Sequence, residues 1–376
     1  MSVRIKGKEY ETYKYEGKNC LYLRGIGISQ LNEIERLENL DQLDILNLSF
    51  NRLSVIKGLE KLKNLIYLNL RGNIINNIAD IHGLSEMGRL KNLNLSENRI
   101  IEIQGLEELS ELKILDLSKN HIKRVSGIES NNKLEELNLS NNRIRYIENL
   151  DNLMALKSLN LSHNNIFEIS GLEKLENLKD LDLEDNRIIK LKGLQNLSKL
   201  ESLNLRKNDA ISKERILLGE VDEDGYAPIG FTPMHYVRYC ALQDLLNQDK
   251  KIDTFLEGLL EDYKQFGFGD LLGSDNVWWW IYRIGFHCID NVKFQEAQLI
   301  GDFLMKFGKD KNNQKILYCA KNLIASICAQ SNDPIVLKKG KDLFEEIKEA
   351  VPAWTDYYLS KSNYEMIINK LHISED

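Results

Sequence analysis

Residues 43–51 read LDILNLSFN, and residues 65–73 read LIYLNLRGN. In both stretches leucine occupies the first, fourth and sixth positions and asparagine occupies the ninth. The same frame starts again at six leucines further along the chain, namely Leu90, Leu112, Leu134, Leu156, Leu178 and Leu200. Neighbouring frames begin 22 residues apart, except for a spacing of 25 between the second and the third. Eight copies in register indicate a repeat architecture, and we number the copies as coils 1 to 8.

Each frame predicts a short strand followed by a turn. The leucines at positions 4 and 6 of the frame alternate with other residues, so they face inward while the residues between them face outward. The asparagine at position 9 then turns the chain, because its amide can both donate to and accept from backbone groups that the bend leaves unpaired. These structural asparagines are Asn51, Asn73, Asn98, Asn120, Asn142, Asn164, Asn186 and Asn208.

The return leg of each coil is expected to be irregular. Seven residues after most of the asparagines stands a glycine, such as Gly58 or Gly127, which fits a left-handed backbone position. Asn149 takes this place in coil 5, and asparagine is the next most tolerant residue. A leg this short has little room for an α-helix and favours 3₁₀ turns. The three extra residues after Asn73 predict an outward bulge near residues 75–87.

A single coil cannot bury its leucines, so the coils are expected to stack. Stacking produces a curved parallel sheet on a concave face, over one continuous core. A weaker copy at Leu21–Leu23 starts the stack, and the repeats extend over residues 25–210. Residues 1–24 alternate around Gly7 and Gly17 and predict a β-hairpin cap. The frame breaks after Asn208, and residues 211–248 are expected to cap the other end.

Beyond residue 234 the apolar pattern changes to the period of a helix, which predicts an α-helical domain over residues 249–376. The helices expected from this pattern are 234–248, 251–266, 276–291, 294–307, 312–329, 335–350 and 353–370. The run Trp278–Tyr282 is apolar on nearly all sides and indicates a central core helix, with an exposed aromatic binding patch as the alternative. The predicted fold class is therefore an α/β solenoid followed by an all-α helical domain.

The composition favours a globular protein that binds neither nucleic acid nor membrane. Asp and Glu number 57 against 50 Lys and Arg, and a net charge of −7 disfavours nucleic-acid binding. The five cysteines are odd in number and contain no C-x-x-C pair, so they predict reduced, mostly buried thiols. The polar N-terminus lacks the apolar stretch of a signal peptide, and the apolar run at residues 277–289 is too short to span a bilayer. We therefore expect a cytoplasmic monomer.

The frames from Leu43 to Asn208 resemble the 22-residue subclass of leucine-rich repeats found in the nuclear regulatory subunit of protein phosphatase 1 and in related intracellular proteins. The resemblance covers over 40% of the chain and rests on the pattern L-x-x-L-x-L-x-x-N-x-I-x-x-I-x-G-L. It implies a solenoid that serves as a scaffold or regulatory subunit by binding another protein. The helical domain has only a loose similarity to helical hairpins of the tetratricopeptide kind.

A protein partner would contact the outward residues of the strands on the concave face. Nine stacked strands form a strip roughly 40 Å long, which suits a protein epitope. Apolar and aromatic groups in the early coils offer anchors, while the carboxylates of coil 7 favour a partner with a basic patch. The nearly uniform column at position 5, from Asn47 to Asn204, is interpreted mainly as part of the scaffold. The candidate binding residues are Ile45, Phe50, Tyr67, Arg71, Ile114, Glu136, Asp180, Asp182, Glu184, Asp185 and Arg206.

The alternative is an enzyme with its chemistry in the helical domain. His287-Cys288-Ile289-Asp290 contains C-x-D, and a helical domain behind such repeats resembles a class of bacterial ubiquitin ligases that use a catalytic cysteine. Those ligases resemble a shorter, proline-marked repeat and have a longer catalytic domain, and Cys288 falls on an apolar helix face. No nucleotide-binding, hydrolase or metalloprotease motif occurs, so we predict no enzyme, no cofactor and no metal.

Overall fold

A computed structural model describes residues 2–211, 292–310, 314–350 and 358–373, together with a few single positions between residues 237 and 289. The chain forms two compact units. The first comprises Met1–Ser212 with Thr232–Ala241, and the second comprises Lys213–Phe231 with Leu242–Asp376. Most of the expected cap at 211–248 and the expected helix at 251–266 lie outside the described residues.

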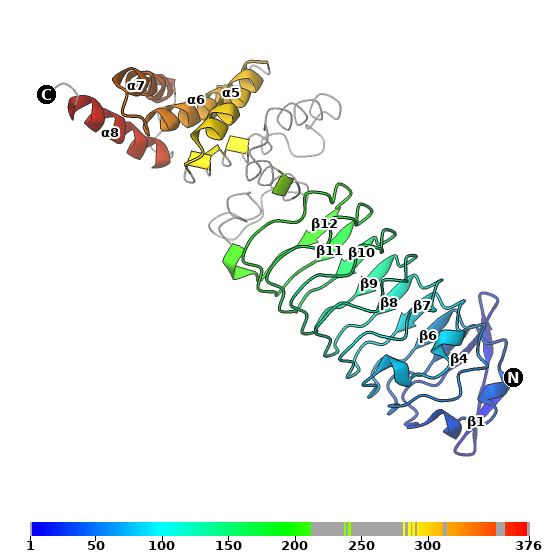
Figure 1. Cartoon of the computed structure of the whole chain (residues 1–376). Coiled ribbons are helices and arrows are strands. Elements are labelled where there is room, and N and C mark those ends of the chain that lie inside the picture. The colour runs from blue at the N-terminus through cyan, green and yellow to red at the C-terminus, as the bar shows by residue number, and fades with distance from the viewer. Residues whose placement is uncertain are drawn as a thin grey trace. The chain divides into compact units, whose positions relative to one another are not determined.

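The frames form the strands of one sheet, and each strand is the x-L-x segment around position 4. Every strand pairs in parallel with the equivalent residues of the next coil, so that Leu115 lies beside Leu137 and Leu137 beside Leu159. The strands lie side by side along the unit, with the return legs on its other side (Figure 1). This arrangement confirms the predicted solenoid. The strands are β5 (Ile45–Asn47), β6 (Tyr67–Asn69), β7 (Asn92–Asn94), β8 (Ile114–Asp116), β9 (Glu136–Asn138), β10 (Ser158–Asn160), β11 (Asp180–Asp182) and β12 (Ser202–Asn204).

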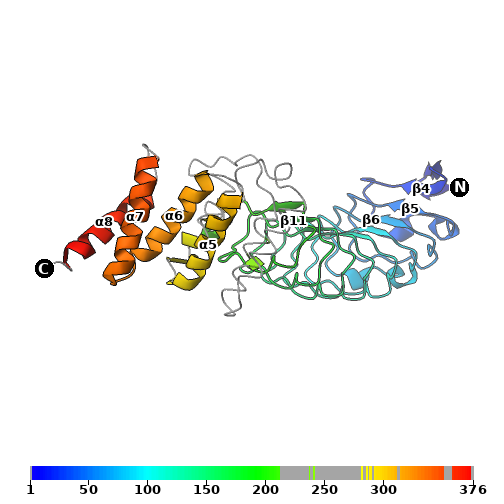
Figure 2. The same ribbon diagram turned by 90° about the horizontal axis from the view of Figure 1, so that it is seen from above.

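The N-terminal segment contains two hairpins rather than the single one that the sequence suggested. The first, β1 (Ser2–Ile5) with β2 (Lys8–Glu11), forms a separate antiparallel sheet. The second, β3 (Tyr13–Tyr15) with β4 (Lys18–Tyr22), adds two strands to the main sheet because β4 pairs in parallel with β5. Figure 2 shows β6, β5 and β4 following one another toward the N-terminus. The main sheet therefore has ten strands in the order β12 to β3.

The core of the first unit is built from the apolar positions of the frame. In coil 4, for example, Leu112, Leu115 and Leu117 are all buried, as are Ile122 and Val125 on the return leg. Burial of one leucine side chain stabilises the fold by about 1.5–3 kcal/mol, so the stack as a whole supplies the stability that a single coil lacks.

The return legs contain 3₁₀ turns, as expected. The structure has η1 (Leu31–Glu33), η2 (Leu37–Asn39), η3 (Ile78–Asp80), η4 (Leu84–Glu86) and η5 (Asp209–Ile211). The return leg at residues 75–87, which carries the three extra residues, forms the pair η3 and η4, whose Ile78 and Leu84 are buried, and its outward bulge stays a prediction. The leading coil has the same 25-residue spacing between β4 and β5, and it holds the pair η1 and η2.

The side chain of each frame asparagine joins two coils. The Asn142 Oδ1 accepts the backbone N–H of Ile122 at 3.0 Å, and its Nδ2 donates to the carbonyls of Leu117 and Leu139, also at 3.0 Å. The same three bonds recur at Asn164 and Asn186. These amides satisfy backbone groups in the interior of the turn that water does not reach.

A second left-handed position lies at position 8 of the frame, and the residue types at this position did not predict it. Phe50, Glu97, Lys119 and Asp185 have φ values of 54–56°, and Gly72 has a φ of 68° at the same position. A residue with a Cβ is disfavoured in this region, so the turn before each asparagine is held in place by the stack around it.

The described part of the second unit contains four helices, and this result confirms a helical C-terminal region. They are α5 (Phe294–Asp310), α6 (Gln314–Cys328), α7 (Pro334–Ala350) and α8 (Tyr358–Ile373). Phe344 and Ile347 of α7 pack with Ile367 of α8 and Ala325 of α6 in a shared apolar core. None of the helices in the described ranges combines the length and the apolar character that a bilayer crossing requires. Trp278–Trp280 lie outside the described residues, whereas Tyr282 is buried.

Candidate functional site

Three rows of side chains run across the strands on the outer side of the sheet, one row for each of positions 3, 5 and 7 of the frame. We call this surface the sheet face. The strand register aligns Ile45, Tyr67, Ile114, Glu136 and Asp180 in the row at position 3. Asp182 lies in the row at position 5, and Arg71, Glu184 and Arg206 lie in the row at position 7. Nine of the eleven candidate residues therefore share one surface, while Phe50 and Asp185 stand beside it at position 8.

In the row at position 5, asparagine and aspartate both fit because each makes the same side-chain hydrogen bond. The Oδ1 atom of Asn138 accepts the backbone N–H of Ser140 at 3.0 Å, and the Oδ1 of Asp116 accepts that of Ser118 in the same way. Only an acceptor is needed for this turn. Asp116 and Asp182 therefore keep the turn and add a second carboxylate oxygen to the sheet face.

A hollow of about 410 Å³ lies on the sheet face over coils 2 to 6. Tyr67 and Ile114 provide an apolar wall, and Asp116 and Glu136 provide two carboxylates. Glu136 lies opposite Ile114, two residues before Asp116 in the register, so the Cα atoms of Glu136 and Asp116 are about 8 Å apart on neighbouring strands. No basic side chain lines the hollow, whose other walls are Asn92, Leu93, Asn94, Leu115, Leu137, Asn138, Ser158 and Asn160.

The phenol of Tyr67 is fixed at the edge of this hollow. Its oxygen accepts a hydrogen bond from the Nδ2 of Asn69 at 3.2 Å. Burial raises the pKa of Tyr67 above its ordinary value, so the ring stays neutral and offers an apolar surface with one polar tip.

Along both edges of the sheet face the charges pair from coil to coil. Glu135 binds the ammonium groups of Lys113 and Lys157, each at 2.5 Å, and these hydrogen bonds lower its pKa to about 2. On the opposite edge Glu97 binds Arg71 at 3.0 Å and Lys119 at 2.8 Å. Neighbouring coils place equivalent residues close enough for such pairing, so a charge on the sheet face that remains unpaired is available to a partner.

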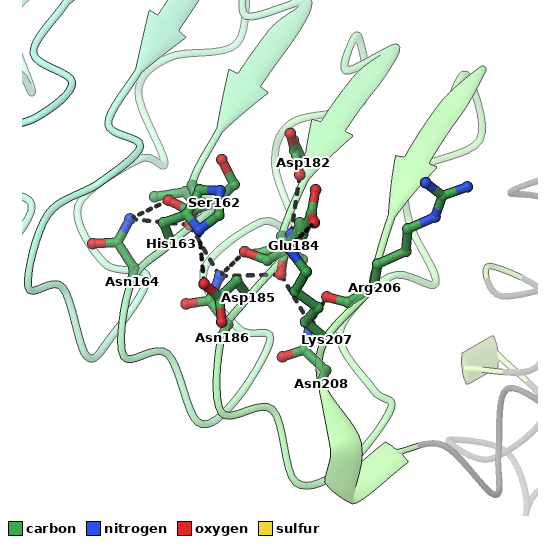
Figure 3. Close-up of polar contacts among 12 residues, drawn as sticks. Ser162, His163, Asn164, Asp182, Glu184, Asp185, Asn186, Arg206, Lys207 and Asn208 are labelled. Carbon is green, nitrogen blue, oxygen red and sulfur yellow. Dashed lines mark hydrogen bonds and ion pairs between the residues drawn. The ribbon is translucent and has the colours of Figure 1, made fainter.

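The four clustered carboxylates of coil 7 differ in whether they form ion pairs, and Figure 3 shows three of them, Asp182, Glu184 and Asp185. Glu184 binds Lys207 at 2.8 Å, and this hydrogen bond is the largest cause of its lowered pKa. Asp185 lies 2.7 Å from the Nδ1 of His163. Asp180 and Asp182 form no ion pair within the described residues, although the Oδ1 of Asp182 accepts the backbone N–H of Glu184.

Asp116 and Glu136 likewise form no ion pair within the part of the chain that the structure describes. Together with Asp180 and Asp182 they give the middle of the sheet face four carboxylates with which none of the described lysines and arginines forms an ion pair. The sheet face is therefore electrostatically complementary to a cation, while its edges are already neutralised.

Phe50 is enclosed by charged neighbours rather than presented as a free anchor. The guanidinium groups of Arg24 and Arg71 lie 4.6 Å and 5.3 Å from its ring centroid. The ring also fills the space beside Gly72, where an added Cβ would come within 2.7 Å of it. At 38% exposure Phe50 still forms part of the surface at the early coils.

The sheet face has an aromatic extension that was not predicted from the sequence. Tyr22 of β4 lies beside Asn47 in the row at position 5, and Tyr13 of β3 stacks on it with ring centroids 5.5 Å apart. The weak frame at Leu21–Leu23 already places Tyr22 outward, so it could have been found. Tyr13 could not, because its position depends on the register of the second hairpin.

Cys288, the candidate nucleophile of the alternative reading, is buried, and burial raises the pKa of its thiol to about 12. A nucleophilic cysteine needs the opposite shift. No group of histidine, cysteine and carboxylate side chains suited to a metal ion occurs among the described residues.

Family models match the repeats in the middle of the solenoid. One, described as leucine-rich repeats in two copies, matches residues 89–130 and 132–174, and a second, described as a leucine-rich repeat, matches residues 174–198. No curated protein is significantly similar in sequence to the chain.

Three solved structures match about half of the chain. Internalin C2 of Listeria monocytogenes is 31% identical, with 50% of this chain and 80% of that chain covered and a TM-score of 0.44. A second internalin of L. monocytogenes is 23% identical, covering 50% and 67% with a TM-score of 0.39. A leucine-rich-repeat protein of Leptospira interrogans is 26% identical, covering 50% and 55% with a TM-score of 0.42. The family models, together with the eight stacked coils, identify the first unit as a leucine-rich-repeat solenoid.

Proposed function

We propose that this protein is a binding scaffold whose sheet face holds a protein partner through a basic patch and an apolar anchor. The observation that carries the proposal is the contrast between the paired charges at the edges of the sheet face and the four unpaired carboxylates in its middle. An unpaired carboxylate attracts a cationic group of a partner and steers its approach.

The dimensions of the sheet face support a protein rather than a small molecule. The nine parallel strands β4 to β12 span roughly 40 Å at the usual strand spacing. A surface of this length can supply an epitope of about 800 Å², the usual size for one side of a protein–protein interface.

The hollow gives the proposal a specific anchor. A lysine or arginine side chain entering it would place its aliphatic stem against Tyr67 and Ile114 and its charge between Asp116 and Glu136. Arginine suits such a site better than lysine, because its planar group can bind two carboxylates and stack on an aromatic ring.

The proposal includes a regulatory role of the kind implied by the likeness to the phosphatase regulatory subunit. Occupation of the sheet face by one protein excludes any other from it. We further propose that the chain acts as a monomer in the cytoplasm, which agrees with five buried, unbridged cysteines.

The test is a binding titration with substitutions that leave the fold intact. Partners captured from an extract of the source cells by the full chain are identified, purified and titrated by calorimetry. Asp116→Asn with Asp182→Asn removes two charges and keeps the acceptor at position 5, since most coils carry asparagine there. We expect affinity to fall at least tenfold, about 1.4 kcal/mol, and its dependence on salt to weaken.

Two further variants complete the titration. Tyr67→Ala removes the apolar anchor and should also weaken binding. Asp151→Asn, an exposed carboxylate on a return leg, serves as the matched control and should leave affinity unchanged. Equal affinities for the wild type, the double variant and Tyr67→Ala would show that the partner binds elsewhere.

A further inference from the structure

The flank of coils 5 to 7 carries large apolar side chains in contact with solvent. This surface is formed by the residues that follow each frame asparagine, outside the sheet face. Tyr146 is 62% exposed, Phe167 is 36% exposed and Ile189 is 65% exposed. The equivalent places in coil 4 hold Lys123 and Arg124, so apolar residues are not required there by the fold.

Backbone hydrogen bonds fix the alignment of these residues. The N–H of Ile189 donates to the carbonyl of Phe167 at 3.1 Å, and that of Arg187 donates to Ile166 at 2.9 Å. The third residue after the asparagine is Arg145 in coil 5, Phe167 in coil 6 and Ile189 in coil 7, so these three follow one another at the spacing of the coils, about 5 Å. Within each coil the exposed residues of this flank follow a buried residue, as Ile189 follows Ile188, so their side chains point away from the core.

Some cations on this flank are paired and others are not. Arg145, Arg187 and Lys190 are exposed and form no ion pair within the described residues. The acidic residues of the same flank are already occupied, because Glu148 binds Arg124 and Glu168 binds Lys192. The flank therefore combines apolar groups with uncompensated positive charge.

We propose that Arg145, Tyr146, Phe167, Arg187, Ile189 and Lys190 form a second docking surface, the flank patch, for an acidic protein segment that carries apolar side chains. Carboxylates of such a segment pair with the three cations, and its aliphatic or aromatic residues cover Tyr146, Phe167 and Ile189. The flank patch is opposite in charge to the sheet face, so the two surfaces select different partners and the proposal does not depend on the proposed function.

A nucleic acid and a second copy of the chain are the competing occupants. Three cations neutralise few phosphates, which gives little affinity for a nucleic acid at physiological salt. In self-association, the cations of the flank patch would face the carboxylates on the sheet face of a second copy. Sedimentation would detect the resulting dimer.

The test uses a fluorescein-labelled peptide of twelve residues that alternates glutamate with leucine, and the full chain. We expect anisotropy to report saturable binding that weakens at least fivefold between 0.15 and 0.5 M salt. Arg187→Glu and Ile189→Ser should each weaken it at least tenfold. Ile101→Ser, the same position in coil 3 and 48% exposed, is the matched control and should bind like the wild type.

Several results would overturn the proposal. Failure of the wild type to bind the glutamate–leucine peptide would do so, as would equal binding by the wild type, Arg187→Glu and Ile189→Ser. A wild-type dimer in sedimentation that Ile189→Ser converts to a monomer would assign the flank patch to self-association. Tighter binding of labelled single-stranded DNA than of the peptide, lost in Arg187→Glu, would assign it to nucleic acid. Matching circular dichroism spectra establish that these exposed substitutions leave the fold intact.

Discussion

Replacing one frame asparagine by alanine, Asn142→Ala, tests how the coils are held together. The wild-type amide makes three well-formed bonds, in which it accepts from the N–H of Ile122 and donates to the carbonyls of Leu117 and Leu139. Each carbonyl is shared, because Leu117 also accepts from Asn120 and Leu139 from Asn164. The substitution therefore leaves only the N–H of Ile122 without a partner.

The expected loss follows from this inventory. A buried donor without a partner costs about 1–3 kcal/mol, and each of the two lost bonds to a shared carbonyl costs about 0.5–1.5 kcal/mol. The sum is a destabilisation of about 2–6 kcal/mol, with a midpoint of about 4 kcal/mol. The destabilisation should be largest in coil 5 and in coils 4 and 6, because each coil contacts only the two adjacent coils.

Hydrogen exchange with mass spectrometry of the full chain is the suitable assay. All four tryptophans lie at residues 278–280 and 354, so their fluorescence does not report on the repeats. Peptides from coils 4 to 6 should exchange faster in Asn142→Ala by a factor corresponding to about 2–6 kcal/mol. Asn132→Ala, an exposed asparagine of the same coil 4 to 5 region, should change exchange by less than about 0.5 kcal/mol. An effect of Asn142→Ala as small as that of Asn132→Ala would refute the role assigned to the asparagine bonds.

Three further outcomes are expected. In urea unfolding, Gly127→Ala should destabilise the solenoid by at least about 2 kcal/mol more than Gly58→Ala. The reason is that the new Cβ meets a carbonyl oxygen at 2.1 Å at position 127 and nothing within 4 Å at position 58. Equal losses of stability in the two variants would contradict this prediction. Two lysines lower the pKa of Glu135 to about 2, so its contribution to stability is present above pH 4.5 and is lost as pH falls toward 2. Glu135→Gln should therefore make the free energy of unfolding depend less on pH between 4.5 and 2. The same pH dependence in the variant and the wild type would argue against the pairing. The thiol of Cys288, with a pKa of about 12, should resist iodoacetamide at pH 8 until the protein is unfolded, and rapid modification of the native protein would reopen the enzymatic alternative.

The repeat frame was sufficient to predict the solenoid, because its spacing fixes which residues meet. The leucines of β8 and β9 pair exactly one repeat apart, so the alignment of Ile114 with Glu136 could be read from the chain alone. The left-handed turn at position 8 could not, since residues as different as Phe50 and Lys119 occupy it. Its conformation is imposed by the neighbouring coils rather than by its own side chain.

The candidate site was predicted in outline and not in its electrostatics. The acidic cluster of coil 7 was found, but the sequence did not show that Lys207 and His163 already bind Glu184 and Asp185. Such pairing depends on rotamers as well as on spacing. The sequence places Asp116 in the uniform column at position 5, and only the geometry separates its Oδ1, which is used in the turn, from its Oδ2, which accepts from the Nδ2 of Asn94 at 3.4 Å.

Site-specific photo-crosslinking in the source cells tests the central claim most directly. A photoreactive phenylalanine analogue at Ser158, on the wall of the hollow, should capture a protein partner, whereas the same group at Asn132 on a return leg should not. Capture at Ser158 that disappears in the Asp116→Asn, Asp182→Asn background is the predicted result. Capture of the same protein from Asn132 and not from Ser158 would contradict a partner-binding sheet face.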